Sequence, residues 1–403
     1  MEIMYISKYA SLPGASAGTR GYNLCKEFLA LGHGAVVINS SSNHLNRLPQ
    51  PASPRGLGRF GYIELDGVPI WTHRTIRYVK TASIRRVLSW IHFELGLSSL
   101  PRHIGRSSTH IIVSSPSILT ILTGLYLARK FGAYFVLEVR DIWPMGLLSE
   151  RSSWFLRKIT KPLEWLEKVG YKNADLIVGT MPNLVERVEE VTESHAKVCA
   201  IGLGIGDELK PLLFNQQSAS RPGVFVVGYA GSFGTSNKVG VLLDVASMYD
   251  GDVSVEFRFY GKGDRYEALR ATHGNQQNIS FRGFLDRQQL YAELTECDLM
   301  VFATGMGPEW KYGQSLHKVV EAMALGKPIL GLYSGFPSMI TEAECGLLVS
   351  GGSSSEFRSA LEKFRAMPEP ARLRMGMKGR EWLMNYRSYT SLAKHYCQEL
   401  QGI

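Results

Sequence analysis

The stretch Ser315-Leu-His-Lys-Val-Val-Glu-Ala-Met-Ala-Leu-Gly-Lys-Pro328 carries the pattern that decides the fold. Its apolar residues recur at the spacing of a helix, and the Gly-Lys-Pro turn then leads into a new apolar strand. Ser315, His317 and Lys318 lie at the start of this helix, where backbone N–H groups attract anions. The stretch therefore predicts a helix-to-strand unit of an α/β sheet, with an anion site at the helix N-terminus.

Glu321 follows one turn later on the same helix. A carboxylate at this position can accept hydrogen bonds from both hydroxyl groups of a ribose. It can also pair with Lys318, because residues three apart on a helix are neighbours on its surface. The sequence leaves these two interpretations open.

Apolar strands alternate with helical segments on both sides of this stretch. Such alternation is typical of parallel sheets covered by helices on both faces, so we expect two doubly wound α/β domains. The expected strands are residues 3–6, 35–38, 62–65, 69–73, 110–113, 134–138 and 176–178 in the first half, and residues 224–229, 253–260, 279–281, 299–303, 328–332 and 346–349 in the second.

The length of the chain also indicates more than one domain, because 403 residues exceed what a single hydrophobic core usually supports. Residues 209–223 lose periodicity and gather Pro, Gln, Ser and Gly, which is the composition of a linker. We therefore expect an N-terminal domain at residues 1–208 and a C-terminal domain at residues 209–385. The tail is helical in pattern from residue 368 onward, and its last part, residues 386–403, is expected to pack back on the N-terminal domain.

Composition narrows the class of protein. With 45% hydrophobic and 20% charged residues, the chain is expected to be globular. The first ten residues have the pattern of a strand rather than of a signal peptide, and no apolar run reaches the length of a membrane span, so we expect a cytoplasmic protein. Free thiols are expected, because the five cysteines are scattered and lack the spacing of zinc ligands: Cys25, Cys199, Cys297, Cys345 and Cys397.

The formal net charge of +9 suits phosphorylated ligands, anionic lipid or nucleic acid. Nucleic acid is the least favoured of these, because the chain has no recognised motif and no stripe of alternating aromatic and basic residues. No group of Asp, Glu or His residues has the spacing of metal ligands, and we expect no metal. The sequence gives no indication of the oligomeric state.

Glycine-rich turns follow three of the expected strands. The first turn leads into the first helix and contains Gly18, and the second, at residues 228–238, contains Gly231 and Lys238. A third turn contains Gly261. Glycine lets the backbone approach a ligand closely, and the N-terminus of a following helix favours an anion. A tight turn without a ligand is the alternative for the first loop.

In their order these pieces resemble glycosyltransferase family 4, a group of retaining enzymes with the GT-B fold, in which two Rossmann-like domains face each other across a cleft. Within that family the chain looks like WbuB-like bacterial transferases of O-antigen and capsule assembly. Their motif has the form SPNKxxEYMAxGKP, and residues 315–328 here read SLHKVVEAMALGKP. The other matching pieces are the loop before Arg20, Gly32-His33, Ser114-Ser115-Pro116, Glu138-Val-Arg140-Asp141-Ile-Trp143-Pro144, Ala174-Asp175 and Gly261-Lys-Gly263.

The resemblance implies that the C-terminal domain binds a nucleotide sugar. Glu321 would bind the ribose, while Ser315, His317 and Lys318 would contact the diphosphate or the sugar. Lys238 would support the pyrophosphate, although most surface lysines of this kind bind nothing. The expected donor-binding residues are Gly18, Gly231, Ser232, Lys238, Gly261, Ser315, His317, Lys318 and Glu321.

The resemblance implies that the N-terminal domain binds the acceptor. Gly18 would border the reaction centre. Arg140 and Asp141 follow a strand and would orient the acceptor or contact the transferred sugar, and a purely structural Arg–Asp pair is the alternative. The expected catalytic residues are Arg140, Asp141, Lys318 and Glu321.

Three positions depart from the family pattern. Gly313 occupies the place of the first of two glutamates, and Ser232 replaces a basic residue that often follows the second-domain glycine. The family's Asn-Gly turn between the domains reads Leu203-Gly204 here. These departures leave the donor sugar open and leave room for a non-catalytic member.

The predicted function is retaining transfer of a hexose or N-acetylhexosamine from a nucleotide sugar, taken to be UDP-linked, in O-antigen or capsule assembly. The acceptor would be polyprenol-linked or an oligosaccharide, and the donor is a co-substrate rather than a cofactor. Two alternatives stay open. A nucleotide-sugar epimerase would share the GT-B fold, and a non-catalytic subunit would bind the donor without transferring its sugar.

Residues 74–97 form a basic and apolar segment. Such a segment can lie in an anionic membrane interface, which would place the protein at the inner face of the plasma membrane. A helix that packs on the core with a solvated basic face explains the pattern equally well. The basic residues are Arg74, Arg77, Lys80, Arg85 and Arg86, and the apolar residues are Ile84, Val87, Leu88, Trp90, Ile91 and Phe93.

Overall fold

A computed structural model describes residues 1–13, 18–42, 59–78, 83–115, 117–145, 154–193, 196–206, 209, 223–234, 237–305 and 307–403. The chain divides into two units, which we describe separately. Unit 1 is Met1–Gly206 together with Ser388–Ile403, and unit 2 is Asp207–Arg387. Residues 14–17 of the first glycine-rich loop, Lys80, Pro116 and most of the expected linker lie outside the described residues.

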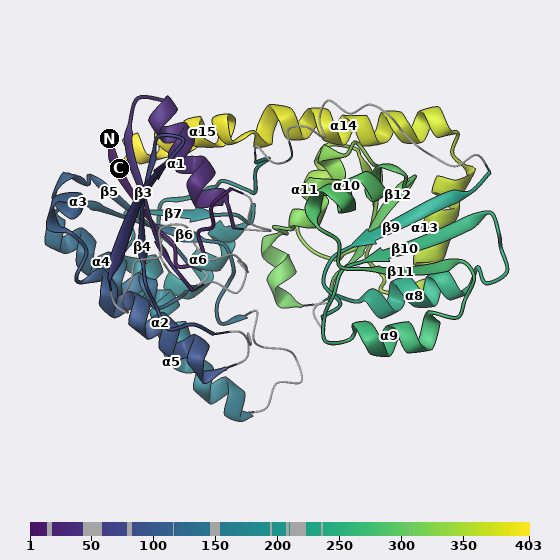
Figure 1. Ribbon diagram of the computed structural model, residues 1–403, viewed down its shortest axis with the longest axis horizontal. Coiled ribbons are helices and arrows are strands. Elements are labelled where there is room, and N and C mark those ends of the chain that lie inside the picture. Colours follow the sequence, from purple (N-terminus) through teal and green to yellow (C-terminus); the bar gives the residue numbers. More distant parts are fainter. Residues whose placement is uncertain are drawn as a thin grey trace. The chain divides into compact units, whose positions relative to one another are not determined.

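Unit 1 is built on an eight-stranded sheet with the strand order β3-β4-β2-β1-β5-β6-β7-β8 (Figure 1). Its neighbouring strands are parallel except β3 and β4, which form a hairpin. The Asp66-Gly67 turn of this hairpin has positive φ at both residues, as tight two-residue turns require. The strands are β1 (Glu2–Ile6), β2 (Gly34–Ser40), β3 (Phe60–Leu65), β4 (Val68–His73), β5 (His110–Ser114), β6 (Tyr134–Val139), β7 (Leu176–Gly179) and β8 (Val198–Ala200).

The helices of unit 1 cover this sheet. The central strand β5 is buried along its whole length, as expected for a parallel strand between two layers of helices. All five cysteines of the chain carry free thiols, as the sequence predicts. The helices are α1 (Arg20–Ala30), α2 (Ile84–Leu97), α3 (Arg102–Ser107), α4 (Thr120–Phe131), α5 (Trp154–Asn173), α6 (Leu184–Thr192) and α15 (Tyr389–Gln401).

The last helix, α15, packs on α1, so the expected return of the C-terminal helix to the first domain is confirmed. Tyr396 meets the ring of Phe28 edge to face at 5.6 Å between centroids. The helical tail is not continuous, however. It breaks at Ser388, whose side chain accepts a hydrogen bond from the backbone N–H of Ser391 and so caps α15. The preceding helix, α14 (Glu369–Arg387), belongs to unit 2.

A buried ion pair joins two of the pieces that matched the family pattern. The Arg20 Nε lies 3.0 Å from Glu138 Oε2, and both side chains are almost fully buried. Arg20 also donates to the carbonyl oxygens of Ile201 and Gly202, and Tyr5 donates to Glu138. Because every charged group here has several partners, the cluster fixes α1 and the end of β8 to the sheet.

Unit 2 is built on a six-stranded parallel sheet with the order β11-β10-β9-β12-β13-β14 (Figure 1). Its strands are β9 (Phe225–Ala230), β10 (Val255–Tyr260), β11 (Ile279–Gly283), β12 (Leu299–Ala303), β13 (Ile329–Leu332) and β14 (Gly346–Val349). Its helices, besides α14, are α8 (Val239–Ser247), α9 (Tyr266–His273), α10 (Arg287–Thr295), the short 3₁₀ helix η2 (Pro308–Tyr312), α11 (His317–Ala324), α12 (Met339–Glu342) and α13 (Ser354–Ala366).

Both sheets reverse their winding direction once. The reversal falls between β1 and β5 in unit 1 and between β9 and β12 in unit 2. Open α/β sheets bind ligands outside the carboxyl ends of their strands at such a switch point. The prediction of two doubly wound α/β domains is confirmed, and the two switch points are the places to look for a site.

Candidate functional site

Three glycine turns meet at the carboxyl end of the unit 2 sheet. The Gly231 N–H donates to the carbonyl oxygen of Tyr260 at 3.0 Å, and the Gly261 N–H donates to that of Gly283 at 2.7 Å. Gly261 has φ +138°, and a Cβ at this position would collide with the carbonyl oxygen of Gly231. The loops that follow β9 and β10 therefore approach each other so closely that Gly261 must be glycine, and a backbone hydrogen bond joins Gly261 to the end of β11.

Helix α11 starts beside these turns. Leu316 occupies its N-cap position, and a leucine side chain has no acceptor for the first-turn N–H groups. His317 is exposed and Ser315 is half-buried, so both lie at the helix N-terminus as predicted. This end of the helix attracts an anion through its N–H groups and its dipole.

Gly313, which replaces a glutamate of the family pattern, has a backbone reason to be glycine. It ends η2 with φ +100°, a region that residues with a Cβ rarely adopt. The chain then continues through Gln314, whose buried side-chain amide donates to Ser338 Oγ. The loop into α11 is thus fixed by backbone geometry and by a buried hydrogen bond.

Lys318 brings α11 and the second glycine loop together. Its Nζ donates to Asn237 Oδ1 at 2.6 Å and lies 5.4 Å from the ring centre of Tyr229. A Cβ on Gly231 would lie 3.4 Å from this Nζ. Burial lowers the pKa of Lys318 to about 8, against the attraction of Glu321. The ammonium group is therefore poorly solvated, and a bound anion would stabilise its charged form.

Glu321 is contacted by a residue that the sequence analysis did not single out. Tyr291 of α10 donates from its hydroxyl group to Glu321 Oε1 at 3.2 Å, and Tyr291 is only 5% exposed. Asn237 lies within the second glycine-rich turn, residues 228–238, and no pattern in the sequence gives it a role. No local pattern marks Tyr291, because it lies 30 residues from its partner.

The other predicted donor residues lie at the same end of the sheet but are more exposed. Ser232 and Lys238 are exposed, and Lys238 is the N-cap residue of α8 without a side-chain capping bond. An aromatic–cation pair also lies here, since the Lys262 ammonium sits 3.9 Å from the ring centre of Phe284, which is 57% exposed. The sequence analysis missed this pair.

In unit 1 the predicted residues follow β1 and β6. Gly18 has φ +85°, and its carbonyl oxygen accepts from the Ser11 N–H at 2.9 Å. The Arg140 N–H donates to Ser115 Oγ at 3.3 Å, and Asp141 is exposed. Among the described residues no ion pair joins Arg140 to Asp141, so the structure gives no support to the alternative of a structural Arg–Asp pair.

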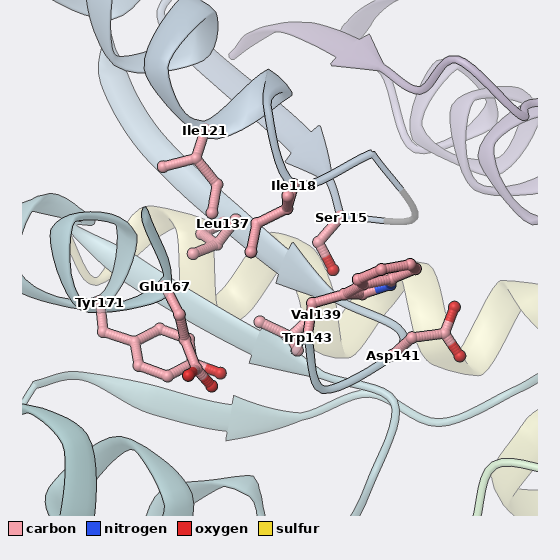
Figure 2. Close-up of a pocket in the computed structure, with 9 residues that line it drawn as sticks. All are labelled: Ser115, Ile118, Ile121, Leu137, Val139, Asp141, Trp143, Glu167 and Tyr171. Carbon is pink, nitrogen blue, oxygen red and sulfur yellow. The ribbon is translucent and has the colours of Figure 1, made fainter. Parts of the chain in front are cut away.

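A small hollow lies beside Asp141. Figure 2 shows Asp141, Trp143 and Ser115 at one side and Ile121, Leu137, Glu167 and Tyr171 at the other. Its volume is about 10 Å³, enough for a single water molecule. The hollow itself is therefore too small for a sugar, and any ligand here would lie on the outside of Trp143.

Helix α2 lies over loops that follow the strands of the unit 1 sheet. Trp90 donates from Nε1 to the hydroxyl group of Tyr9 at 2.6 Å and meets Trp143 edge to face at 6.1 Å. Arg86 stacks on Trp90 at 5.0 Å. The buried ammonium of Lys8 donates to Ser89 Oγ at 2.9 Å, and burial lowers its pKa to about 7. These contacts fix the inner side of the helix.

The outer side of α2 carries apolar residues that face solvent. Ile84 is 78% exposed and Leu95 is 68% exposed, and the same face carries Val87, Leu88 and Ile91. We call these five residues the α2 stripe. Among the described residues of the range 74–97, the helical ones are Ile84–Leu97. None of the helices in the described segments combines the length and hydropathy needed to cross a bilayer.

Across the described parts of the chain, no three side chains of His, Cys, Asp or Glu come close enough to hold a metal ion. The described residues that supply positive charge at the unit 2 site include Lys318, and the first turn of α11 adds its N–H groups. A doubly wound domain with a cation, amide donors and a carboxylate at its switch point is equipped to bind the phosphates and the ribose of a nucleotide.

Comparison with known proteins agrees with this geometry. The chain is similar over its whole length to three solved structures. Sucrose-phosphate synthase from Thermosynechococcus elongatus has a TM-score of 0.74 at 17% identity, with 98% of that chain covered. Anabaena Alr3699/HepE in complex with UDP and glucose has a TM-score of 0.68 at 14% identity, with 100% covered. WaaG, a glycosyltransferase involved in lipopolysaccharide biosynthesis, has a TM-score of 0.66 at 13% identity, with 100% covered.

These similarities define the fold class as GT-B, as predicted. Residues 224–366, which make up most of unit 2, match the family described as Glycosyl transferases group 1. Unit 2 therefore contains a group 1 glycosyltransferase domain, within a chain that has the GT-B fold. A search of curated proteins found no match.

Proposed function

We propose that the chain transfers a hexose or an N-acetylhexosamine from a UDP-sugar, with retention, to a lipid-linked or glycan acceptor in bacterial surface polysaccharide assembly. One observation carries the donor half of this proposal. Gly231, Gly261 and the α11 pair Lys318 and Glu321 come from three separate segments and converge at the carboxyl end of one sheet. The acceptor half rests on the WbuB-like resemblance and on the surface of unit 1.

The chemistry of the reaction matches what this end of unit 2 supplies. Breaking the anomeric bond leaves negative charge on the diphosphate while the sugar becomes oxocarbenium-like. Groups that stabilise the leaving charge therefore accelerate the reaction. In our proposal Lys318 and the N–H groups at Ser315 and His317 hold the diphosphate, and Lys238 adds charge from the N-cap of α8. Because these groups are cationic or donate hydrogen bonds, we propose that transfer needs no metal ion.

Glu321 is the ribose ligand in this proposal, and UDP is the nucleotide. Tyr291 donates a hydrogen bond to Glu321 Oε1, and a carboxylate, with its two oxygens, can accept hydrogen bonds from both hydroxyls of a ribose. The choice of UDP is supported by the structural neighbour HepE, which was solved with UDP and glucose. The exposed ring of Phe284 offers a surface on which a base could stack.

The acceptor side of the proposal rests on unit 1. Asp141 is an exposed carboxylate that can accept bonds from sugar hydroxyls, and Trp143 beside it offers an apolar face. Arg86 and Arg140 supply positive charge that would attract a phosphate group of the acceptor. Gly18 would border the acceptor at the start of α1. Together these side chains suit an acceptor in which a sugar is linked through phosphate to a hydrocarbon chain.

We further propose that the α2 stripe rests on an anionic membrane at the inner face of the plasma membrane. An exposed apolar stripe flanked by basic residues binds such surfaces through both hydrophobic contact and charge. Arg77 and Arg85 are exposed and supply the charge, while Lys80 lies outside the described residues. The lipopolysaccharide role stated for WaaG is in keeping with this setting.

The donor proposal is tested by thermal shift with UDP, GDP, ADP and dTDP in the presence of EDTA. A bound nucleotide raises the melting temperature by mass action. We expect UDP alone to stabilise the protein, and we expect Glu321→Ala to abolish the effect. The matched control is Glu344→Ala, which removes an exposed carboxylate of unit 2 and should leave the shift unchanged. Stabilisation that requires added Mg²⁺ would contradict the metal-free proposal.

The membrane proposal is tested by flotation with vesicles that contain 30% phosphatidylglycerol, roughly the anionic character of a bacterial inner leaflet. Leu95→Glu should reduce the bound fraction several-fold. Val253→Glu is the control, because Val253 is an exposed apolar residue of unit 2, 85% accessible, outside the stripe. Equal loss in both variants, or no loss in either, would count against the α2 stripe as the membrane contact.

The same assays separate the alternatives. Conversion of the donor to an epimer without acceptor would identify an epimerase. Nucleotide binding with neither transfer nor donor hydrolysis, across a panel of lipid-linked and oligosaccharide acceptors, would favour a binding subunit.

A further inference from the structure

Two opposite charges lie three residues apart on α11, yet different partners hold them. Lys318 Nζ donates to Asn237, which lies in the loop after β9. Glu321 Oε1 accepts from Tyr291 of α10. Residues at this spacing on a helix readily form an ion pair, and the two groups do attract each other, since Glu321 raises the pKa of Lys318.

We infer that Tyr291 is a positioning residue of the donor site, which keeps Glu321 turned away from Lys318 and in the orientation that receives the ribose. This inference rests on the proposed ribose role of Glu321. A closed Lys318–Glu321 pair would occupy both groups at once. The carboxylate would lose lone pairs needed for the hydroxyls, and the ammonium would lose charge needed for the diphosphate.

Burial makes the tyrosine suited to this task. Tyr291 is 5% exposed, so solvent competes little for its hydroxyl group, and its helix fixes the direction of the bond. A glutamate side chain has several rotatable bonds, and ordering it only when the ligand arrives weakens binding. A hydrogen bond from a buried phenol orders it in advance.

Unit 2 provides a matched control for the same kind of bond. Tyr249 donates to Glu362 at 2.6 Å, and this pair joins the end of α8 to α13, away from the glycine turns. Tyr249→Phe and Tyr291→Phe therefore each remove one phenol-to-carboxylate hydrogen bond from the same unit. A loss of stability that both variants share would show that each hydrogen bond supports the fold. A loss of nucleotide affinity in Tyr291→Phe alone would show that Tyr291 acts on the donor site.

The test compares UDP with 2′,3′-dideoxy-UDP by titration calorimetry in EDTA. Wild type should prefer UDP, because only UDP offers hydroxyls to Glu321. Tyr291→Phe should weaken UDP by about 5- to 20-fold, the size expected for one hydrogen bond to a charged group. It should weaken the dideoxy nucleotide several-fold less, because that nucleotide offers no hydroxyls to Glu321 and would lose only the charge of Lys318. Tyr249→Phe should leave both affinities unchanged.

Each of the other possible outcomes contradicts either the role of Tyr291 or the ribose role of Glu321. If Tyr291→Phe weakens both nucleotides equally, the tyrosine is structural and the inference is wrong. If it changes neither affinity while wild type discriminates, the inference fails and the ribose role of Glu321 stands. If wild type binds both nucleotides equally well, the ribose role fails and the inference fails with it.

Discussion

The carboxyl ends of the two sheets differ although both units are doubly wound. In unit 2 this end carries three glycine turns and an uncapped helix start, with His317 and Ser232 exposed. In unit 1 helix α2 lies over the loops at this end and is tied down by the buried Lys8 and by the Trp90–Tyr9 bond. The difference shows how one topology yields an edge with glycine turns and an uncapped helix start in one unit and an aromatic, covered edge in the other.

The largest effect is expected from a substitution that disrupts the glycine turns of unit 2. Gly261→Ala should destabilise the protein by about 3 kcal/mol or more and abolish nucleotide binding, because it combines an unfavourable φ with a backbone collision. Gly251→Ala is the control. Gly251 also has positive φ, at +83°, but a Cβ there meets nothing within 4 Å, so the cost should be about 1 kcal/mol. Urea unfolding and UDP titration measure both, and equal effects would contradict the convergence of the turns.

The second-largest effect is expected from removal of the half-buried cation of Lys318. Lys318→Met should lower kcat/KM for transfer by about 100- to 1000-fold, because positive charge at the leaving diphosphate stabilises the transition state. Lys363→Met removes an exposed lysine of α13 in the same unit and should change kcat/KM by less than about 2-fold. Steady-state kinetics at saturating acceptor concentration measures kcat/KM for both variants. An unchanged rate in Lys318→Met would move the diphosphate away from α11.

A smaller effect is expected on the dissociation constant of UDP when the pH is raised. The pKa of Lys318 is lowered to about 8 in the free protein, and a bound diphosphate favours the charged form, so the pKa rises in the complex. Below about pH 8 the lysine is charged in both states and its contribution to the dissociation constant is flat. Above pH 8 binding takes up a proton, and the dissociation constant should increase by up to about tenfold per pH unit. Lys318→Met should remove this slope between pH 8 and 9.5, and a slope that survives would belong to another group.

The smallest effect concerns the aromatic edge of unit 1. Trp143→Ala should raise the KM for the acceptor by about 5- to 10-fold, through loss of an apolar contact, and leave donor hydrolysis without acceptor unchanged. Trp165→Ala is the control, because Trp165 is 58% exposed on α5 of the same unit. An acceptor KM that changes equally in both variants would remove Trp143 from the acceptor site.

What the sequence predicted well was local. The helix start at residues 315–318 and the glycine turn at Gly231 each depend on neighbours within a few residues, so spacing alone located them. The departure at Gly313 was also visible in the sequence. Its backbone reason, a φ of +100° at the end of a 3₁₀ helix, became apparent only in the structure.

What the sequence did not predict depends on packing between distant segments. Tyr291 and Asn237 meet their partners across 30 and 81 residues, and neither is part of a repeated or charged pattern. The covered edge of unit 1 likewise depends on Lys8 reaching Ser89, again 81 residues away. The basic and apolar pattern of residues 74–97 could not tell which side of α2 faces the core, because apolar residues lie on both sides.

The measurement that tests the central claim most directly is a crystal structure with UDP, grown without divalent metal. We predict that the diphosphate lies at the N-terminus of α11 within hydrogen-bonding distance of Lys318, beside Gly231, and that both ribose hydroxyls contact Glu321. A nucleotide bound elsewhere on the chain, or at this edge with its ribose away from Glu321, would contradict the account.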